Sequence, residues 1–97
     1  MKNRKIKYNK YPLIAQEELD LHGLFKEEAK TAVSAFLEKA RINEYKRVRI
    51  ITGKGWHSSE GRGVLKDLVL KILDEKGLSY SEAKINEGGS GAINVDL

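Results

Sequence analysis

Leu19-Asp20-Leu21-His22-Gly23 is the stretch that decides the fold of this 97-residue chain. Side chains on a strand alternate between its two faces, so Leu19 and Leu21 are predicted to enter the core while Asp20 and His22 share the opposite face. Gly23 then allows the backbone to turn sharply. A carboxylate and an imidazole are therefore expected side by side at the carboxyl end of a strand, where open α/β sheets place their ligands. The alternative is that Asp20 only orients a structural His22.

Working outward from this stretch, hydrophobic spacing predicts four strands and two helices. One helical stripe runs from Phe25 to Ala40, and a second begins at Val64 and ends before Gly77. The strands are expected at residues 18–22, 47–51, 80–86 and 92–97. Two right-handed crossovers place both helices on one face, and the last short connection implies an antiparallel partner. The predicted fold class is an α/β two-layer sandwich, βαβαββ, with a mixed four-stranded sheet.

Length and composition limit the class of protein. A chain of 97 residues can form one domain with a single core. The absence of Cys excludes a disulfide framework and a Cys-based zinc site. No apolar run approaches the roughly 20 residues that span a bilayer, and no signal-peptide core follows the basic N-terminus. We therefore expect a cytoplasmic protein with no membrane contact, and a monomer.

The positive charge is concentrated at the N-terminus. Residues 1–12 contain five Lys or Arg and no acid, and the remaining residues hold 13 basic and 14 acidic side chains, a balance of −1. The predicted organisation is a basic arm at residues 1–16 followed by a domain at residues 17–97. The arm is interpreted either as a nucleic-acid contact or as a solvated terminus. Arg47 and Arg49 are expected on the sheet face away from the helices.

Two glycine-rich segments are candidates for phosphate binding. Neither the dinucleotide fingerprint nor the P-loop pattern is present. Thr52-Gly53-Lys54-Gly55 follows a predicted strand and combines backbone N–H groups with an ammonium, an arrangement that can hold a phosphate. Gly88 and Gly89 lie in a second segment, 87–91, whose simplest interpretation is a hairpin turn.

Taken together, three motifs resemble the Smr (small MutS-related) domain. They are Leu-Asp-Leu-His-Gly at 19–23, Thr-Gly-Lys-Gly at 52–55 with His57-Ser58 after it, and Gly-Gly-Ser-Gly-Ala at 88–92 with Val95 and Leu97. The resemblance covers residues 17–97 and implies a fold similar to the C-terminal domain of translation initiation factor 3. One departure is Lys26, where many members have Thr or Ser. Met1 and the end at Leu97 fit a small free-standing bacterial member of this family.

The resemblance also implies a function, an endonuclease acting on DNA or RNA, with some members cleaving messenger RNA on stalled ribosomes. Asp20 and His22 match the pair usually linked to cleavage, and Gly53, Lys54 and Gly55 match the phosphate loop. The partners expected are RNA or DNA and, for the RNA-cleaving branch, the ribosome. An RNA substrate offers its 2′-OH as the nucleophile and needs no metal, whereas DNA requires water or hydroxide, for which Mg²⁺ or Mn²⁺ is the candidate.

Two other classes of function stay open. A non-catalytic nucleic-acid-binding module would use phosphate contacts from cations together with a stacking surface at Trp56, which can equally be a hydrophobic lid. An adaptor domain would recruit a protein through the open sheet face. His57 is either a second proton-transfer group or a loop hydrogen-bonder. The substrate-binding residues predicted are Gly53, Lys54, Gly55, His57, Arg47, Arg49, Gly88 and Gly89, with Lys84 as a further cation for the binding module.

Overall fold

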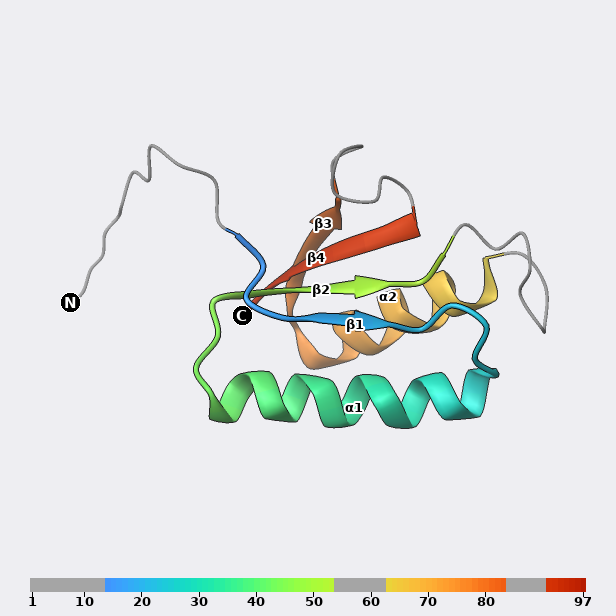
Figure 1. Cartoon of the computed structure of the whole chain (residues 1–97), viewed down its shortest axis with the longest axis horizontal. Helices are drawn as coiled ribbons and strands as arrows, with labels where there is room; N and C mark the ends of the chain where they lie inside the picture. Colours follow the sequence, from blue (N-terminus) through green and yellow to red (C-terminus); the bar gives the residue numbers. More distant parts are fainter. Residues whose placement is uncertain (1–13, 54–62, 84–90) are drawn as a thin grey trace.

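The computed structural model describes residues 14–53, 63–83 and 91–97. Within them the elements follow the order β1, α1, β2, α2, β3, β4. Their bounds are β1 Glu18–Asp20, α1 Lys26–Ile42, β2 Arg47–Ile51, α2 Val64–Lys76, β3 Ser79–Glu82 and β4 Ala92–Asp96. Figure 1 shows the two helices lying against one face of the sheet. The predicted two-layer α/β sandwich with a mixed four-stranded sheet is therefore confirmed.

The strands are arranged in the order β1-β2-β4-β3. β1 and β2 are parallel, and β4 is antiparallel to both of its neighbours, β2 and β3. The antiparallel pairing of the last two strands was predicted from their short connection. The insertion of β4 between β2 and β3 was not, because the neighbours of a strand depend on hydrogen bonds to distant parts of the chain.

Both helices cover the sheet with amphipathic faces. Each contributes residues at helical spacing to the core, where they meet alternate residues of β2 and β4 and Leu21, which directly follows β1. The buried cluster consists of Leu21, Ala29, Val33, Phe36, Leu37, Ala40, Val48, Ile50, Leu65, Val69, Ile72, Leu73, Ile93 and Val95. Every residue of α1 and α2 in this cluster belongs to one of the two predicted stripes.

The ends of the elements differ from the predictions in ways that sequence explains. β1 ends at Asp20 instead of residue 22, because the chain turns at His22 and Gly23. β3 begins at Ser79 and ends at Glu82, so the expectation of a strand through Ala83 is wrong, although Ala83 N–H still donates to the Ala92 carbonyl. Residues 84–86 lie outside the described part.

Helix ends carry the capping that their sequences provide. Lys26 opens α1 without a hydroxyl, and the Glu28 carboxylate accepts the backbone N–H of Phe25 at 3.0 Å instead. The departure at Lys26 is thus compensated within the first turn. Gly77 ends α2 with φ of 69°, a left-handed conformation that favours glycine. No described helix is long and apolar enough to cross a membrane.

Candidate functional site

The carboxyl end of β1 brings Asp20 and His22 into direct contact. His22 Nδ1 lies 2.6 Å from Asp20 Oδ1, and the same oxygen accepts the His22 backbone N–H at 3.0 Å. Both side chains are exposed, His22 at 72% and Asp20 at 51%. The prediction that the two groups emerge together on an accessible surface is confirmed.

A tight turn produces this contact, so strand alternation is not its cause. Leu24 N–H donates to the Leu21 carbonyl at 3.0 Å, which places His22 and Gly23 at the centre of a four-residue turn. Gly23 has φ of 82°, the left-handed value that the third position of a type II turn requires. Asp20 then receives the backbone N–H two residues ahead, a local bond typical of Asp at turns.

The electrostatics of the pair fix its protonation pattern. The hydrogen bond from the His22 side chain, the largest influence, lowers the pKa of Asp20 below its ordinary value of 3.8. An ionised carboxylate only accepts hydrogen bonds, so Nδ1 must carry the proton of a neutral His22 ring. Nε2 then holds the lone pair. Within the described residues, no side chain hydrogen-bonds to Nε2, and it is accessible to a ligand.

The start of the predicted phosphate loop lies beside this pair. A Cβ built on Gly53 would approach His22 Cβ to 3.2 Å, so the backbone of Gly53 is close to the imidazole-bearing residue. Gly53 also has φ of 75°. Glycine is required here both by the close approach and by the conformation. The expected neighbourhood of the Asp-x-His pair and this loop is confirmed as far as Gly53; Lys54, Gly55 and His57 lie outside the described residues.

Gly91 clamps the same loop from the other side. Thr52 N–H and Gly53 N–H both donate to the Gly91 carbonyl, at 2.8 and 3.0 Å. The buried Thr52 hydroxyl lies 3.4 Å from that oxygen as well. The second glycine-rich segment therefore ends against the first. Thr52 and Gly91 were not among the predicted site residues, although a polar residue directly after a buried strand signals such a role. Gly88 and Gly89 lie outside the described part.

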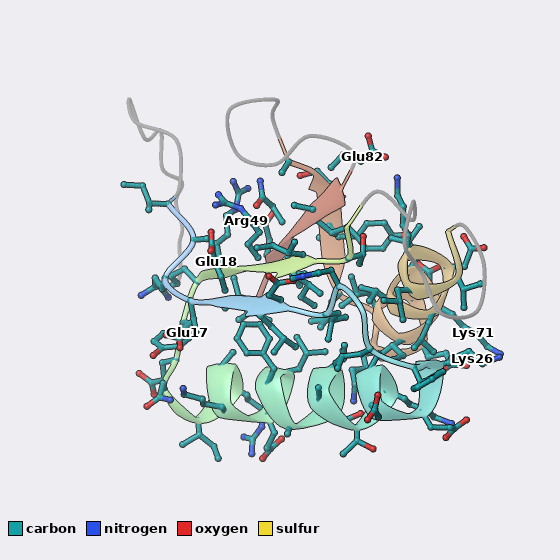
Figure 2. All side chains as sticks on the ribbon, turned by 45° about the vertical axis from the view of Figure 1, so that its right-hand side comes forward. Glu17, Glu18, Lys26, Arg49, Lys71 and Glu82 are labelled. Carbon is teal, nitrogen blue, oxygen red and sulfur yellow. The ribbon has the colours of Figure 1, made fainter. Side chains whose placement is uncertain are left out.

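Arg47 and Arg49 project from the face away from the helices, as predicted, and both are engaged by acidic partners. Arg47 Nε lies 2.6 Å from Asp96 Oδ1, and Arg49 bonds Glu18 at 2.8 Å and the buried Asn94 side chain at 2.9 Å. Figure 2 shows Glu18 and Arg49 together on this side of the sheet. Their predicted contact with a nucleic acid stays a prediction.

The described residues contain no cluster of three or more Asp, Glu, His or Cys side chains that could hold a metal ion. Asp20 and His22 provide one carboxylate and one imidazole, already bonded to each other. Mg²⁺ is commonly bound through one or two carboxylates with substrate phosphates and waters completing the shell. Asp20 is the residue of this site that would contribute to such a shell.

Comparison with known protein families matches residues 19–97 to the Smr domain. The fold and the site thus belong to a class of small α/β domains related to MutS proteins. This chain is a member of the Smr domain family.

Among its relatives, endonuclease MutS2 of Helicobacter pylori is 39% identical over 88 residues, covering 89% of this chain and 11% of that protein. An Smr domain-containing protein of Schizosaccharomyces pombe is 32% identical over 72 residues, covering 74% of this chain and 34% of its own length. The chain therefore spans about a tenth and a third of these two relatives. The Smr domain of Thermus thermophilus MutS2 has a TM-score of 0.73 and 34% identity, over 84% of this chain and 96% of that one.

A stand-alone small MutS-related protein from Escherichia coli is similar in structure, with a TM-score of 0.75 and 30% identity. The match covers 82% of this chain and 63% of that chain. The family includes proteins named as endonucleases, so nuclease family membership is established for the domain.

Proposed function

We propose that this protein is an endonuclease that cleaves phosphodiester bonds in RNA or DNA, with His22 moving the proton. The observation that carries the proposal is the 2.6 Å contact between His22 Nδ1 and Asp20 Oδ1 on an exposed turn. It leaves Nε2 as a base near neutral pH, the range in which a histidine commonly serves as acid or base. The names of the MutS2 relatives support the same reaction class.

Each residue of the pair has a separate role in this mechanism. His22 Nε2 accepts the proton of the attacking oxygen, which is the 2′-OH in RNA or a water in DNA. Asp20 holds the ring in the Nδ1–H tautomer and stabilises the imidazolium that forms. The predicted loop from Gly53 to Gly55, with the Lys54 ammonium, stabilises charge on the phosphate. With RNA, bond formation from O2′ and loss of O5′ leave a 2′,3′-cyclic phosphate and a 5′-hydroxyl.

The test uses end-labelled single- and double-stranded RNA and DNA, each with Mg²⁺, Mn²⁺ or EDTA. His22→Ala should slow cleavage by roughly 10²- to 10⁴-fold, the usual contribution of general acid–base catalysis. Asp20→Asn should slow it less, since the ring stays but loses its charged partner. Glu38→Gln is the matched control, because Glu38 is also an exposed, ion-paired carboxylate but lies in the carboxyl-terminal part of α1.

The outcomes separate the enzyme from the binding module. Cleavage that disappears in His22→Ala and persists in Glu38→Gln supports the assignment. Equal activity in all three preparations identifies a contaminating nuclease and removes the basis for the assignment. Binding by the parent protein without cleavage under every ion condition would make the domain a non-catalytic nucleic-acid-binding module.

A further inference from the structure

A groove lies between the amino-terminal halves of α1 and α2, on the helix side of the fold. Its volume is about 410 Å³, within the roughly 300–1,000 Å³ of ligand-binding pockets. Val64 and Leu68 form an apolar part of its lining, and the other lining residues are charged. They are Lys26, Glu27, Lys30, Asp67 and Lys71.

Two lysines of the groove carry uncompensated charge. Glu27 and Asp67 stand at helical spacing from Lys30 and Lys71, three and four residues away, where ion pairs commonly form. Across the described part of the chain, neither Lys30 nor Lys71 takes part in a salt bridge. Both side chains belong to exposed residues. The ammonium groups are therefore accessible to an anion from outside.

The opposite face of the molecule offers a contrast. There, Arg47 and Arg49 each meet an acidic side chain within 3 Å, with their own side chains only 19% and 13% exposed. Neutralised and half-buried guanidinium groups attract a polyanion less than accessible ammonium groups do. Charge complementarity to phosphate therefore favours the groove over the sheet face.

The groove also opens at the same end of the fold as the Asp20–His22 pair. α1 starts four residues after His22, so the Cα atoms of His22 and Lys26 are at most about 14 Å apart. Figure 1 shows the carboxyl ends of β1 and β2 and the starts of both helices at one end of the molecule. In Figure 2, Lys26 and Lys71 lie together there. A strand bound at His22 reaches the groove within a few nucleotides.

We propose that this groove binds backbone phosphates of the nucleic acid, next to the phosphate that His22 meets, through Lys30 and Lys71. The proposal rests on the proposed function for its ligand. Lys26 and Lys30 are one helical turn apart, about 6 Å along α1. A stacked strand advances about 3.4 Å per nucleotide, so this turn spans about two phosphates.

The test measures binding separately from cleavage. In a His22→Ala background, a fluorescent 12-nucleotide single-stranded RNA and the DNA of the same sequence are titrated by anisotropy between 50 and 300 mM KCl. The groove variant is Lys30→Gln with Lys71→Gln. The matched control is Lys46→Gln with Lys76→Gln, which removes the same charge from two exposed lysines at the far ends of the connection to β2 and of α2.

Removal of one phosphate contact should make the slope of log K against log salt shallower by about 0.7 and weaken binding about fivefold at 0.1 M salt. The groove variant should therefore bind roughly 25-fold more weakly than the parent, whereas the control should change less. A Kd ratio of five or more between the two double variants supports the groove, and a smaller ratio overturns it. Circular dichroism and thermal melting of both variants verify that the fold is intact.

Failure of this proposal and failure of the proposed function give different results. If the parent cleaves and the groove variant binds like the control, only the groove assignment falls. If the parent binds and the groove variant loses binding, but cleavage is never seen, the groove stands and the nuclease assignment falls. If the parent binds neither polymer, both fall.

Discussion

Asp20 makes two bonds to the same neighbour, and this double contact determines what the carboxylate can do. One oxygen accepts both the backbone N–H and the ring N–H of His22. The imidazole is thereby held in one orientation although it is largely exposed to solvent. An exposed ion pair contributes little to stability, so the contact is better understood as positioning than as reinforcement.

The lowered pKa of Asp20 leads to a prediction about pH. Because the folded state favours the ionised carboxylate, the associated stability is present above pH 3.8 and is lost as the pH falls through the lowered pKa. An NMR titration should give Asp20 a midpoint below 3.8 in the parent protein and nearer 3.8 in His22→Ala.

Glu38 is the internal control for that titration. A hydrogen bond from Arg41, the main cause, lowers the pKa of Glu38 below 4.5, far from His22 in the sequence. Its midpoint should be the same in both proteins. An Asp20 midpoint that does not move in His22→Ala would contradict the assigned hydrogen bond. With Asp20 ionised, any change in cleavage rate between about pH 5 and 8 must come from another group.

Gly53 gives a second prediction at this scale. Ala at this position must adopt φ of 75° and place its Cβ 3.2 Å from His22 Cβ. Gly77→Ala carries the same kind of strain at φ of 69° with nothing within 4 Å. Urea unfolding should show a loss of about 1–2 kcal/mol for each, the cost of a left-handed L-residue. Only Gly53→Ala should also slow cleavage, because it displaces His22. Equal cleavage rates in the two variants would show that the proximity of Gly53 to His22 has no catalytic consequence.

The residue types of the site could be predicted, but not the way the chain brings them together. Alternation correctly placed Asp20 and His22 on one accessible surface, yet the structure uses a turn at His22 to achieve it. The clamp between Thr52 and Gly91 joins positions 39 residues apart. Such contacts depend on sheet order, which local spacing does not determine. Lys30 and Lys71 could not be singled out for a related reason, because each is an ordinary surface residue until two helices are placed side by side.

At the scale of elements, the face of the sheet away from the helices is tied together by side chains. Arg49 on β2 reaches Glu18 on β1 and Asn94 on β4, and so crosses three strands. Arg47 joins β2 to Asp96 on β4. These contacts run between strands that are already paired in the backbone, and they hold β1 and β4 against the two sides of β2.

Arg49→Leu should therefore destabilise the fold. It removes a donor from Asn94, which is 4% exposed, and the loss of a partner for a buried polar group costs about 1–3 kcal/mol. Arg41→Leu is the control, since it removes an arginine whose partner, Glu38, is also exposed. Urea unfolding should show a clear loss for Arg49→Leu and little change for Arg41→Leu. Equal midpoints for the two variants would mean that the network across the sheet adds nothing.

At the scale of the whole molecule, positive charge is distributed between an arm and a nearly neutral domain. Residues 1–12 carry five of the 18 basic side chains. They lie outside the described residues, but the chain is attached to the sheet by Gln16, whose N–H donates to the Arg47 carbonyl at 2.8 Å. The predicted boundary between arm and domain thus falls next to a residue that already pairs with β2.

Deletion of residues 1–12 should reduce salt-sensitive affinity for nucleic acid. The slope of log K against log salt should become shallower by about 0.7–0.9 for each phosphate that the arm no longer neutralises. A full-length variant with the five cations changed to Gln separates charge from chain length and should behave like the deletion. An unchanged slope in both would show that the arm does not touch the polyanion.

β4 is the last element in the sequence and lies between β2 and β3. Among the described strands, β3 has no neighbour except β4. During synthesis, which proceeds at about 5–20 residues per second, the sheet therefore cannot be completed until β4 has left the ribosome. The Gly91 carbonyl that holds the loop beside His22 emerges just before β4. A nascent chain thus carries Asp20 and His22 long before it has the means to assemble the site around them.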